Sequence, residues 1–185
     1  MTRIAFVVEG ATAYEVFDRA ICPQLKQKGI QVKLVKRPNR DKLIADAGNN
    51  LDDLRQAGYQ HVFFVLDQED DECPPATARR LEGIRQEPDV IVCVVSRMLE
   101  AWLLADGEAI QKATGQFSGP QFTDELPDPV DVLKTLFHRK DHQWRTKMEM
   151  ARIVARYFCL ERAAVRNHSA NRFLKKLRER LGEPV

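Results

Sequence analysis

Acidic residues follow three of the apolar runs in this chain. Glu9 comes directly after the first run, Asp67 directly after a later one, and Glu100 lies one helical turn beyond the last. Carboxylates gathered in one place repel one another unless a cation neutralises them, and hard oxygen ligands favour Mg²⁺ or Mn²⁺. Such a metal polarises phosphoryl groups and activates water. If the fold brings these positions together, they predict a divalent-metal site.

The second of these acids opens a longer acidic run, Asp67–Glu72, which includes Glu69 and Asp70. A solvated acidic loop is the alternative interpretation of this run. Asp67 differs from the residues that follow it, because it directly abuts a run of apolar residues. We therefore expect Asp67 to lie at the end of a buried strand rather than out in a loop.

Glu100 lies inside the apolar stretch Met98–Leu104. A carboxylate in such surroundings needs a partner or a metal, because burying an unpaired charge is costly. A salt bridge with Arg97 is the simpler structural interpretation. Otherwise Glu100 is expected to be a further metal ligand or a general base.

Lys147 shares one face of a predicted helix with Met150, Val154 and Phe158, so we expect it to point toward the body of the protein. Two interpretations follow. Either its aliphatic stem lies along the core, or its ammonium reaches a phosphate at the acidic edge.

The elements that must position these residues follow an alternating pattern. Helical segments separate four short apolar runs, and this order is typical of a parallel sheet connected by right-handed crossovers. The predicted strands are Ile4–Val8, Ile30–Val35, His61–Leu66 and Val90–Val95, and the predicted helices between them are Ala13–Lys28, Asn50–Ala57 and Pro75–Gln86. The second run alternates, which predicts a half-exposed or edge strand, whereas the last two are continuous and predict burial on both faces. The ligand site of such a sheet lies beyond the carboxyl ends of its strands.

The pattern changes after the fourth run. A short apolar helix, Met98–Ala105, is followed by a Gly/Pro/Asp-rich loop over 114–129. Three helices are expected after the loop, at Val130–His138, Thr146–Phe158 and Ser169–Leu181. We interpret the chain as one compact unit, with an α/β domain over 1–110 and a loop and helical cap over 111–185.

Charge is unevenly distributed along the chain. Residues 1–137 carry 16 Lys and Arg against 22 Asp and Glu, whereas residues 138–185 carry 13 against five. A basic segment beside an acidic body suits a protein that binds a polyanion, although the two halves also neutralise each other within one fold. The candidate contacts to a nucleic-acid backbone are Arg145, Arg152, Arg172, Lys175 and Lys176.

Several classes of protein are disfavoured by what the sequence lacks. It contains no GxxxxGK[ST] phosphate-binding loop, no GxGxxG after the first strand and no GxSxG nucleophile motif. The four cysteines show no CxxC-type spacing, so neither zinc nor a disulfide framework is indicated. No stretch approaches the length of a membrane helix and the N-terminus has no signal-peptide pattern, so we expect a cytoplasmic protein that does not contact a membrane.

Three motifs together resemble a Toprim-like bacterial family of unknown function, whose members often lie beside ATPases in anti-phage defence loci. They are Val8–Thr12, which reads VEGAT, the acidic Asp67–Asp70, and Met98–Asp106, which reads MLEAWLLAD. The similarity covers the whole chain. Its most specific part is the Glu-Ala-Trp-Leu-Leu-Ala-Asp string from Glu100 to Asp106.

This resemblance implies a Rossmann-like, Toprim-like fold and a Mg²⁺ or Mn²⁺ site. The metal ligands that it implies are Glu9, Asp67 and Glu69, with Asp70 beside them. The sequence departs from the family pattern at Ala13, where a second Glu is usual, and at Glu69, where Asp is commoner. Toprim domains occur in enzymes that break or make phosphodiester bonds.

The predicted function is metal-dependent phosphodiester hydrolysis on nucleic acid, by a partner of an ATPase. Glu9, Glu100 and Lys147 are the candidate catalytic residues. Two alternatives remain open: a non-catalytic module that binds nucleic acid or a protein partner, and a small-molecule phosphotransfer enzyme that uses the same metal site.

Overall fold

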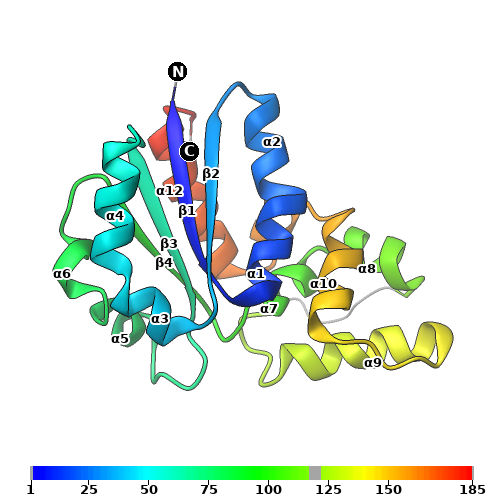
Figure 1. The fold of residues 1–185 in the computed structure, drawn as a ribbon. Coiled ribbons are helices and arrows are strands. Elements are labelled where there is room, and N and C mark those ends of the chain that lie inside the picture. Colours follow the sequence, from blue (N-terminus) through cyan, green and yellow to red (C-terminus); the bar gives the residue numbers. More distant parts are fainter. Residues whose placement is uncertain (1, 117–121, 185) are drawn as a thin grey trace.

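The computed structural model describes residues 2–116 and 122–184. Four parallel strands form one sheet in the order β2-β1-β3-β4. The strands are β1 (Arg3–Glu9), β2 (Gln31–Arg37), β3 (His61–Asp67) and β4 (Val90–Val95). Each coincides with a predicted strand to within two residues. Figure 1 shows the sheet at the centre of the molecule with helices around it, which confirms the predicted α/β class.

Burial along the strands follows their position in the sheet. In both central strands, β1 and β3, the five residues between the two end residues are fully buried. The edge strand β2 has an alternating pattern with no buried residue, as its sequence predicted. β4 is the other edge strand, yet it is largely buried, because helices cover both of its faces.

Two groups of helices sandwich the sheet. One face is covered by α1 (Gly10–Val16), η1 (Phe17–Ile21), α2 (Cys22–Gln27) and α12 (His168–Leu181), and the other by α3 (Arg40–Ala45), α4 (Ala47–Gln56), α5 (Pro74–Arg79) and α6 (Glu82–Arg85). The single helix predicted over 13–28 is in fact interrupted, because η1 is a π-helical segment between α1 and α2. The single helix predicted over 75–86 is two short helices.

Alternate residues of each strand enter two separate cores. Phe6 and Phe63 face the core under α1 and α12, whereas Ala5 and Phe64 face the core under α3 and α4. Phe173 of α12 lies at the centre of the first core, with its ring 5.2–6.1 Å from four other aromatic rings. The C-terminal helix is therefore part of the main core of the α/β unit.

The remaining helices lie between β4 and α12 in the chain. They are α7 (Glu100–Ala105), α8 (Gly107–Thr114), α9 (Pro129–Asp141), α10 (Lys147–Ala155) and α11 (Leu160–Ala164). The sequence analysis missed α3, α8 and α11, which are all short. α8 runs across position 110, where the sequence analysis divided the chain, and part of the predicted loop over 114–129 lies outside the described residues. Within the described ranges, no helix is long and apolar enough to cross a membrane, and the four cysteines are free.

The strand order fixes where a ligand site is expected. The chain leaves β1 toward β2 on one side, and β3 then lies on the other side of β1. The loops that follow β1 and β3 therefore diverge, and such a switch point opens a crevice at the carboxyl ends of the strands. Glu9 and Asp67 are the last residues of those two strands.

Candidate metal and phosphate site

A side chain joins the ends of β1 and β3. Glu9 Oε2 accepts a hydrogen bond from the backbone N–H of Asp67, at 3.2 Å. That N–H points toward β1, where the regular ladder ends, and the carboxylate takes the place of the next backbone acceptor. The chain then turns into α1 at Gly10, whose φ of +71° is a conformation that glycine adopts without strain. A Cβ at this position would meet no atom within 4 Å, so it is the backbone conformation that calls for glycine here.

The carboxyl groups at this edge affect one another's ionisation. Burial raises the pKa of Asp67 well above its usual range, and the neighbouring charges of Glu100, Glu9 and Glu69 raise it further, while Lys147 lowers it. Burial also raises the pKa of Glu9; the Asp67 N–H opposes this, and the charge of Glu69 adds to it. The fold therefore holds Glu9, Asp67, Glu69 and Glu100 close enough together for their charges to repel.

Glu100 is the most deeply buried of these acids. It is the first residue of α7 and its side chain is 0% exposed. Neither carboxylate oxygen accepts a hydrogen bond within the described structure, although Oε1 lies 3.2 Å from Lys147 Nζ. Lys147 and Glu100 thus form an ion pair without a hydrogen bond, so the oxygens of Glu100 retain the capacity to bind a further group.

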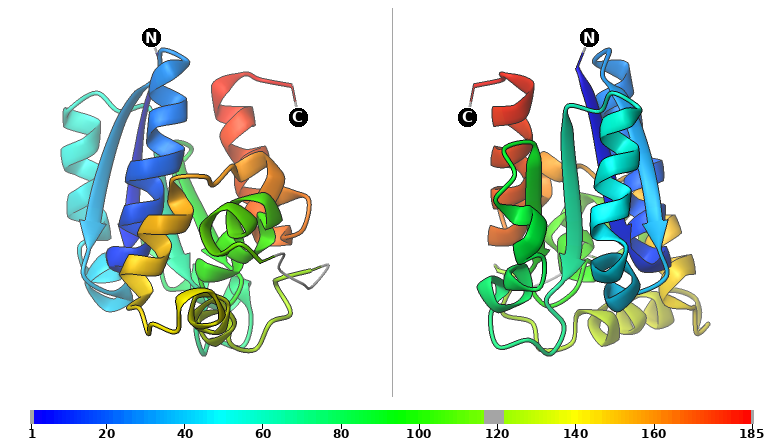
Figure 2. Two further views of the ribbon diagram at one scale, coloured as in Figure 1. Left: turned by 90° about the vertical axis from the view of Figure 1, so that its right-hand side faces the viewer. Right: turned by 60° about the vertical axis from the view of Figure 1, so that its left-hand side comes forward.

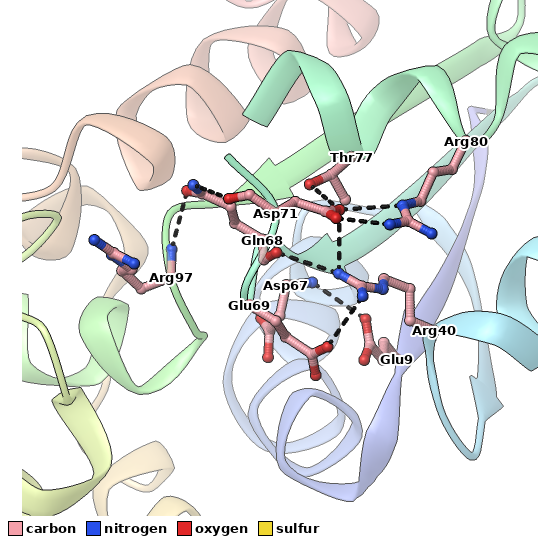
Figure 3. A network of polar contacts seen from close by, with 9 residues as sticks. All are labelled: Glu9, Arg40, Asp67, Gln68, Glu69, Asp71, Thr77, Arg80 and Arg97. Atoms are coloured by element: carbon pink, nitrogen blue, oxygen red, sulfur yellow. Dashed lines mark hydrogen bonds and ion pairs between the residues drawn. The ribbon is translucent and has the colours of Figure 1, made fainter. Parts of the chain in front are cut away.

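The alternative pairing of Glu100 with Arg97 is wrong. Arg97 has a positive φ of 61° and an exposed side chain, which Figure 3 shows pointing away from the acidic cluster. Lys147 takes the expected direction toward the body of the protein, and its ammonium meets a carboxylate there.

A capping box fixes the position of Lys147. Thr146 Oγ1 accepts the N–H of Glu149 at 3.3 Å, and Glu149 Oε2 accepts the N–H of Thr146 at 2.8 Å. This reciprocal pair satisfies two backbone donors and begins α10 at Lys147. Met150 and Val154 then bury the same helix in the core, so the ammonium is held at the edge by packing as well as by charge.

The loop after β3 is held by an arginine from a neighbouring helix (Figure 3). Arg40 of α3 lies 3.5 Å from Glu69 Oε2 and 3.2 Å from Asp71 Oδ2, and it donates to the carbonyl of Gln68. Asp71 also accepts bonds from Arg80 and Thr77. The bond from Arg80, followed by that from Thr77, holds the pKa of Asp71 below its usual range. Asp71 is thus a structural anchor of this loop.

The other acids predicted from this loop lie differently. Glu69 adopts a positive φ of 49° and its side chain approaches Glu9, as Figure 3 shows. Asp70 is exposed and takes part in no ion pair among the described residues. The roles of Glu9, Asp67, Glu69 and Asp70 as metal ligands stay predictions.

Sequence reasoning missed Arg40, because α3 itself was missed. Its signal was present as Pro38-Asn39, a turn followed by a helix cap. The Asn39 side chain accepts the N–H of Lys42 at 2.9 Å and so begins the helix at Arg40. This cap places the guanidinium within reach of the β3 loop.

The predicted nucleic-acid contacts do not form one patch beside the acids. Arg152 donates two hydrogen bonds to Glu15, and Arg145, which precedes α10, is paired with Asp141. Arg172, Lys175 and Lys176 are exposed on α12, and Lys176 donates to the carbonyl of Val92. None of these contacts tests nucleic-acid binding, which stays a prediction.

The string from Glu100 to Asp106 combines a site residue with two structural ones. Trp102 Nε1 donates to Ser169 Oγ at 2.8 Å, which ties α7 to α12. Asp106 is fully buried and accepts bonds from the backbone of Ala109 and Cys159 and two from Arg162. Trp102 and Asp106 are thus satisfied structural residues, whereas the oxygens of Glu100 accept no hydrogen bond.

The chemistry of the donors suits a hard cation. Within the described ranges, no group of three or more His, Cys, Asp or Glu side chains is arranged as a metal site in its own right. Mg²⁺ needs less than that, since it keeps several waters and is commonly bound by one or two carboxylates together with substrate phosphates. Glu9 and Asp67, two neighbouring carboxyl groups at the strand ends, have the donor chemistry of such a partial site, and their binding of a cation stays a prediction.

Comparison with known proteins gives a family and one structural similarity. Among curated proteins no sequence matches this chain. The C-terminal region of the Burkholderia pseudomallei OLD protein is similar at 20% identity, with 96% of this chain and 98% of that chain covered and a TM-score of 0.42. A similarity this loose does not bear on function. Residues 8–178 match the family described as Domain of unknown function (DUF4276). The match spans nearly the whole chain, which therefore belongs to the DUF4276 family.

Proposed function

We propose that this protein hydrolyses phosphodiester bonds of nucleic acid with the help of Mg²⁺ or Mn²⁺. The observation that carries the proposal is the environment of Glu100. A fully buried carboxylate whose oxygens accept no hydrogen bond lies beside Asp67, whose own pKa is raised by burial and by that charge. Such an arrangement lowers the free energy of unfolding. Carboxyl groups in strongly perturbing surroundings of this kind cluster at functional sites.

In the proposed site, Glu9, Asp67 and Glu69 hold the cation, with Asp70 available as a further ligand. A bound divalent cation polarises the phosphoryl group and lowers the pKa of the attacking water. The resemblance to Toprim-like proteins supports this ligand set, and the switch point between β1 and β3 supports the location.

Glu100 and Lys147 are proposed to act on the phosphate directly. Glu100 takes the proton of the attacking water while the water oxygen forms a bond to phosphorus; the ester P–O bond breaks, and the leaving oxygen takes up a proton from solvent water. Lys147 Nζ, already 3.2 Å from Glu100 Oε1, contacts a phosphate oxygen and offsets its charge. The side chain of Lys147 is 38% exposed, so it is not enclosed in the core together with Glu100.

Two finer parts of the proposal rest on the resemblance alone. One is an ATPase as partner protein, and the other is a role in anti-phage defence.

For substrate binding, Arg172, Lys175 and Lys176 of α12 are proposed contacts to the phosphate backbone at a distance from the acids. Arg145, which precedes α10, and Arg152, within α10, are further proposed contacts.

The test is a cleavage assay on the full chain. Labelled single-stranded and duplex DNA and RNA are incubated with Mg²⁺ or Mn²⁺, and with EDTA as control. We expect cleavage that EDTA abolishes and that Asp67→Asn and Glu100→Gln each reduce by about 100-fold or more. Glu72→Gln is the matched control, because Glu72 is exposed in the same loop, and it should cleave like the parent.

Two outcomes would contradict the proposal. Cleavage that survives in Asp67→Asn would come from another site or another protein. Nucleic-acid binding that persists in EDTA without any cleavage would instead support the non-catalytic module.

A further inference from the structure

A groove runs along the outer edge of β4, away from the acidic cluster. It consists of two adjoining cavities of about 590 and 300 Å³, which share Ala78, Arg85, Val92 and Lys176 in their linings. α5 and α6 form one wall and α12 forms the other. Figure 2 shows β4 as the outermost strand with α12 beside it.

The floor of this groove contains backbone groups that no strand pairs. Val62 donates to Asp89 O and Gln68 donates to Val95 O, so the odd-numbered residues of β4 face β3. The N–H and C=O groups of Val92 and Val94 therefore point outward, into the groove that both residues line. An open edge of this kind can take up an additional strand.

The charged residues in the walls of the groove are mainly basic. Arg172 and Lys176 of α12 line the larger cavity together with Arg85, and Arg180 lines the smaller one. Glu179 is the acidic residue in these linings. Arg85 has a partner in Glu82, at 3.2 Å, whereas the ammonium of Lys176 donates at 3.1 Å to the outward carbonyl of Val92. The cation at the centre of the groove thus occupies an acceptor that an incoming strand would use.

We propose that the β4 groove binds an extended, acidic peptide segment of a partner protein, which adds to the sheet beside β4. Backbone pairing with Val92 and Val94 gives affinity, and acidic side chains at alternate positions, which share one face of the added strand, meet Arg172, Lys176 and Arg180 on the α12 wall. Pro74 and Pro75 supply apolar contacts on the opposite wall. When the segment binds, Lys176 exchanges the Val92 carbonyl for a carboxylate, and the carbonyl accepts a peptide N–H.

Charge decides between this occupant and a second copy of the chain. Pairing two β4 edges would bring Arg172 and Lys176 of one copy against the same residues of the other, and like charges oppose that contact. A nucleic-acid strand would satisfy the cations but has no alternating N–H and C=O groups to match the edge.

The experiment uses the full chain and a fluorescein-labelled peptide of about eight residues, long enough for the six residues of β4, in which Glu and Val alternate. Two further peptides carry N-methyl groups, one on every Glu and the other on every Val. In a strand only one of these two sets faces β4. We expect one methylated peptide to lose about tenfold or more in affinity and the other to bind like the parent.

Protein variants test the charges. Arg172→Glu with Lys176→Glu should weaken peptide binding by about tenfold or more. Lys175→Glu is the matched control, because Lys175 is exposed on the same helix and lies outside the groove linings, and it should bind within about twofold of the parent. In amide spectra, the signals of Val92 and Val94 should shift more than those of Ile91 and Cys93.

Three results would overturn the proposal. The first is loss of binding by both methylated peptides or by neither. The second is displacement of the peptide by an oligothymidylate of equal length, which would make the groove a nucleic-acid path. The third is dimerisation of the parent protein that Arg172→Glu with Lys176→Glu changes in strength, which would make the β4 edge a contact between two copies of the chain. Arg172 and Lys176 are also proposed contacts to nucleic acid, so the second result would decide which of the two ligands these cations bind. None of these readouts depends on the metal site, so the proposed hydrolysis is tested separately.

Discussion

Lys147 Nζ lies 3.2 Å from Glu100 Oε1 and joins the first residue of α10 to the first residue of α7. The two partners differ in exposure, with the Glu100 side chain fully buried and that of Lys147 38% exposed. A partly exposed lysine therefore supplies the counter-charge of a fully buried carboxylate. This pair links the helices that follow the sheet to the sheet edge where Glu9 and Asp67 lie.

Removing the ammonium should destabilise the protein. Lys147→Met leaves Glu100 buried without its counter-charge, and we expect a loss of about 1–3 kcal/mol in the free energy of unfolding, less than for a fully buried pair. Adding Glu100→Gln to this variant should recover most of the loss, because the uncompensated charge is gone. Urea unfolding of the parent, both single variants and the double variant gives the coupling energy. A coupling near zero would mean that the pair is not formed in solution.

Asp67→Asn should leave the metal-free protein as stable as the parent, or more stable. The folded-state pKa of Asp67 is raised, so its ionisation costs stability once the pH exceeds the unfolded value of 3.8, and the cost grows until the pH passes the folded pKa. The variant's advantage should therefore increase as the pH rises through that window. Unfolding of both proteins from pH 4 to pH 8 in EDTA measures it. A clear loss of stability in Asp67→Asn at neutral pH would make Asp67 a structural acceptor.

The contact between α1 and α10 should be sensitive to acid. Hydrogen bonds from Arg152 and then Arg19 lower the pKa of Glu15 from 4.5 to about 2. The stability that this carboxylate contributes is present above pH 4.5 and is lost as the pH falls toward 2. Glu15→Gln should cost about 1 kcal/mol at pH 7, after allowing for the exposure of the arginines, and less at pH 3. A cost that does not change with pH would attribute it to packing.

Asp106 should be more sensitive to substitution than its exposed neighbour. Asp106→Asn breaks the paired bonds with Arg162 and weakens those from the backbone of Ala109 and Cys159, in a fully buried place. We expect a loss of about 2–4 kcal/mol in the free energy of unfolding. Glu108→Gln is the control, because Glu108 lies two residues further on, exposed in the first turn of α8, and it should change stability little. Equal effects of the two substitutions on the free energy of unfolding would contradict the structural role of Asp106.

The sheet was predictable because β1, β3 and β4 are continuous runs rich in β-branched and aromatic residues. The alternation over Ile30–Val35 predicted a half-exposed or edge strand, and β2 lies at an edge of the sheet. Short helices were harder, since α3 and α11 are too short to show a period of 3.6 residues. α8 left a readable signal, with Asp106 as its cap and Gly115 in the left-handed conformation after its last residue.

Within the candidate site, sequence reasoning found the acids but not their partners. Position at a strand end was enough to single out Glu9 and Asp67. The partner of Glu100 could not be chosen that way, because Arg97 is adjacent in sequence whereas Lys147 is adjacent only in the fold. Pairing between distant segments depends on how the helices pack, and local spacing carries no information about it.

The central claim is that the acids at the ends of β1 and β3 bind a divalent cation, and a Mn²⁺ titration of thermal stability tests it most directly. A metal bound only by the folded state must raise the melting temperature. We predict a saturable rise for the parent and for Glu72→Gln, and none for Asp67→Asn. A melting temperature that does not respond to Mn²⁺, or an equal rise in Asp67→Asn, would contradict the account.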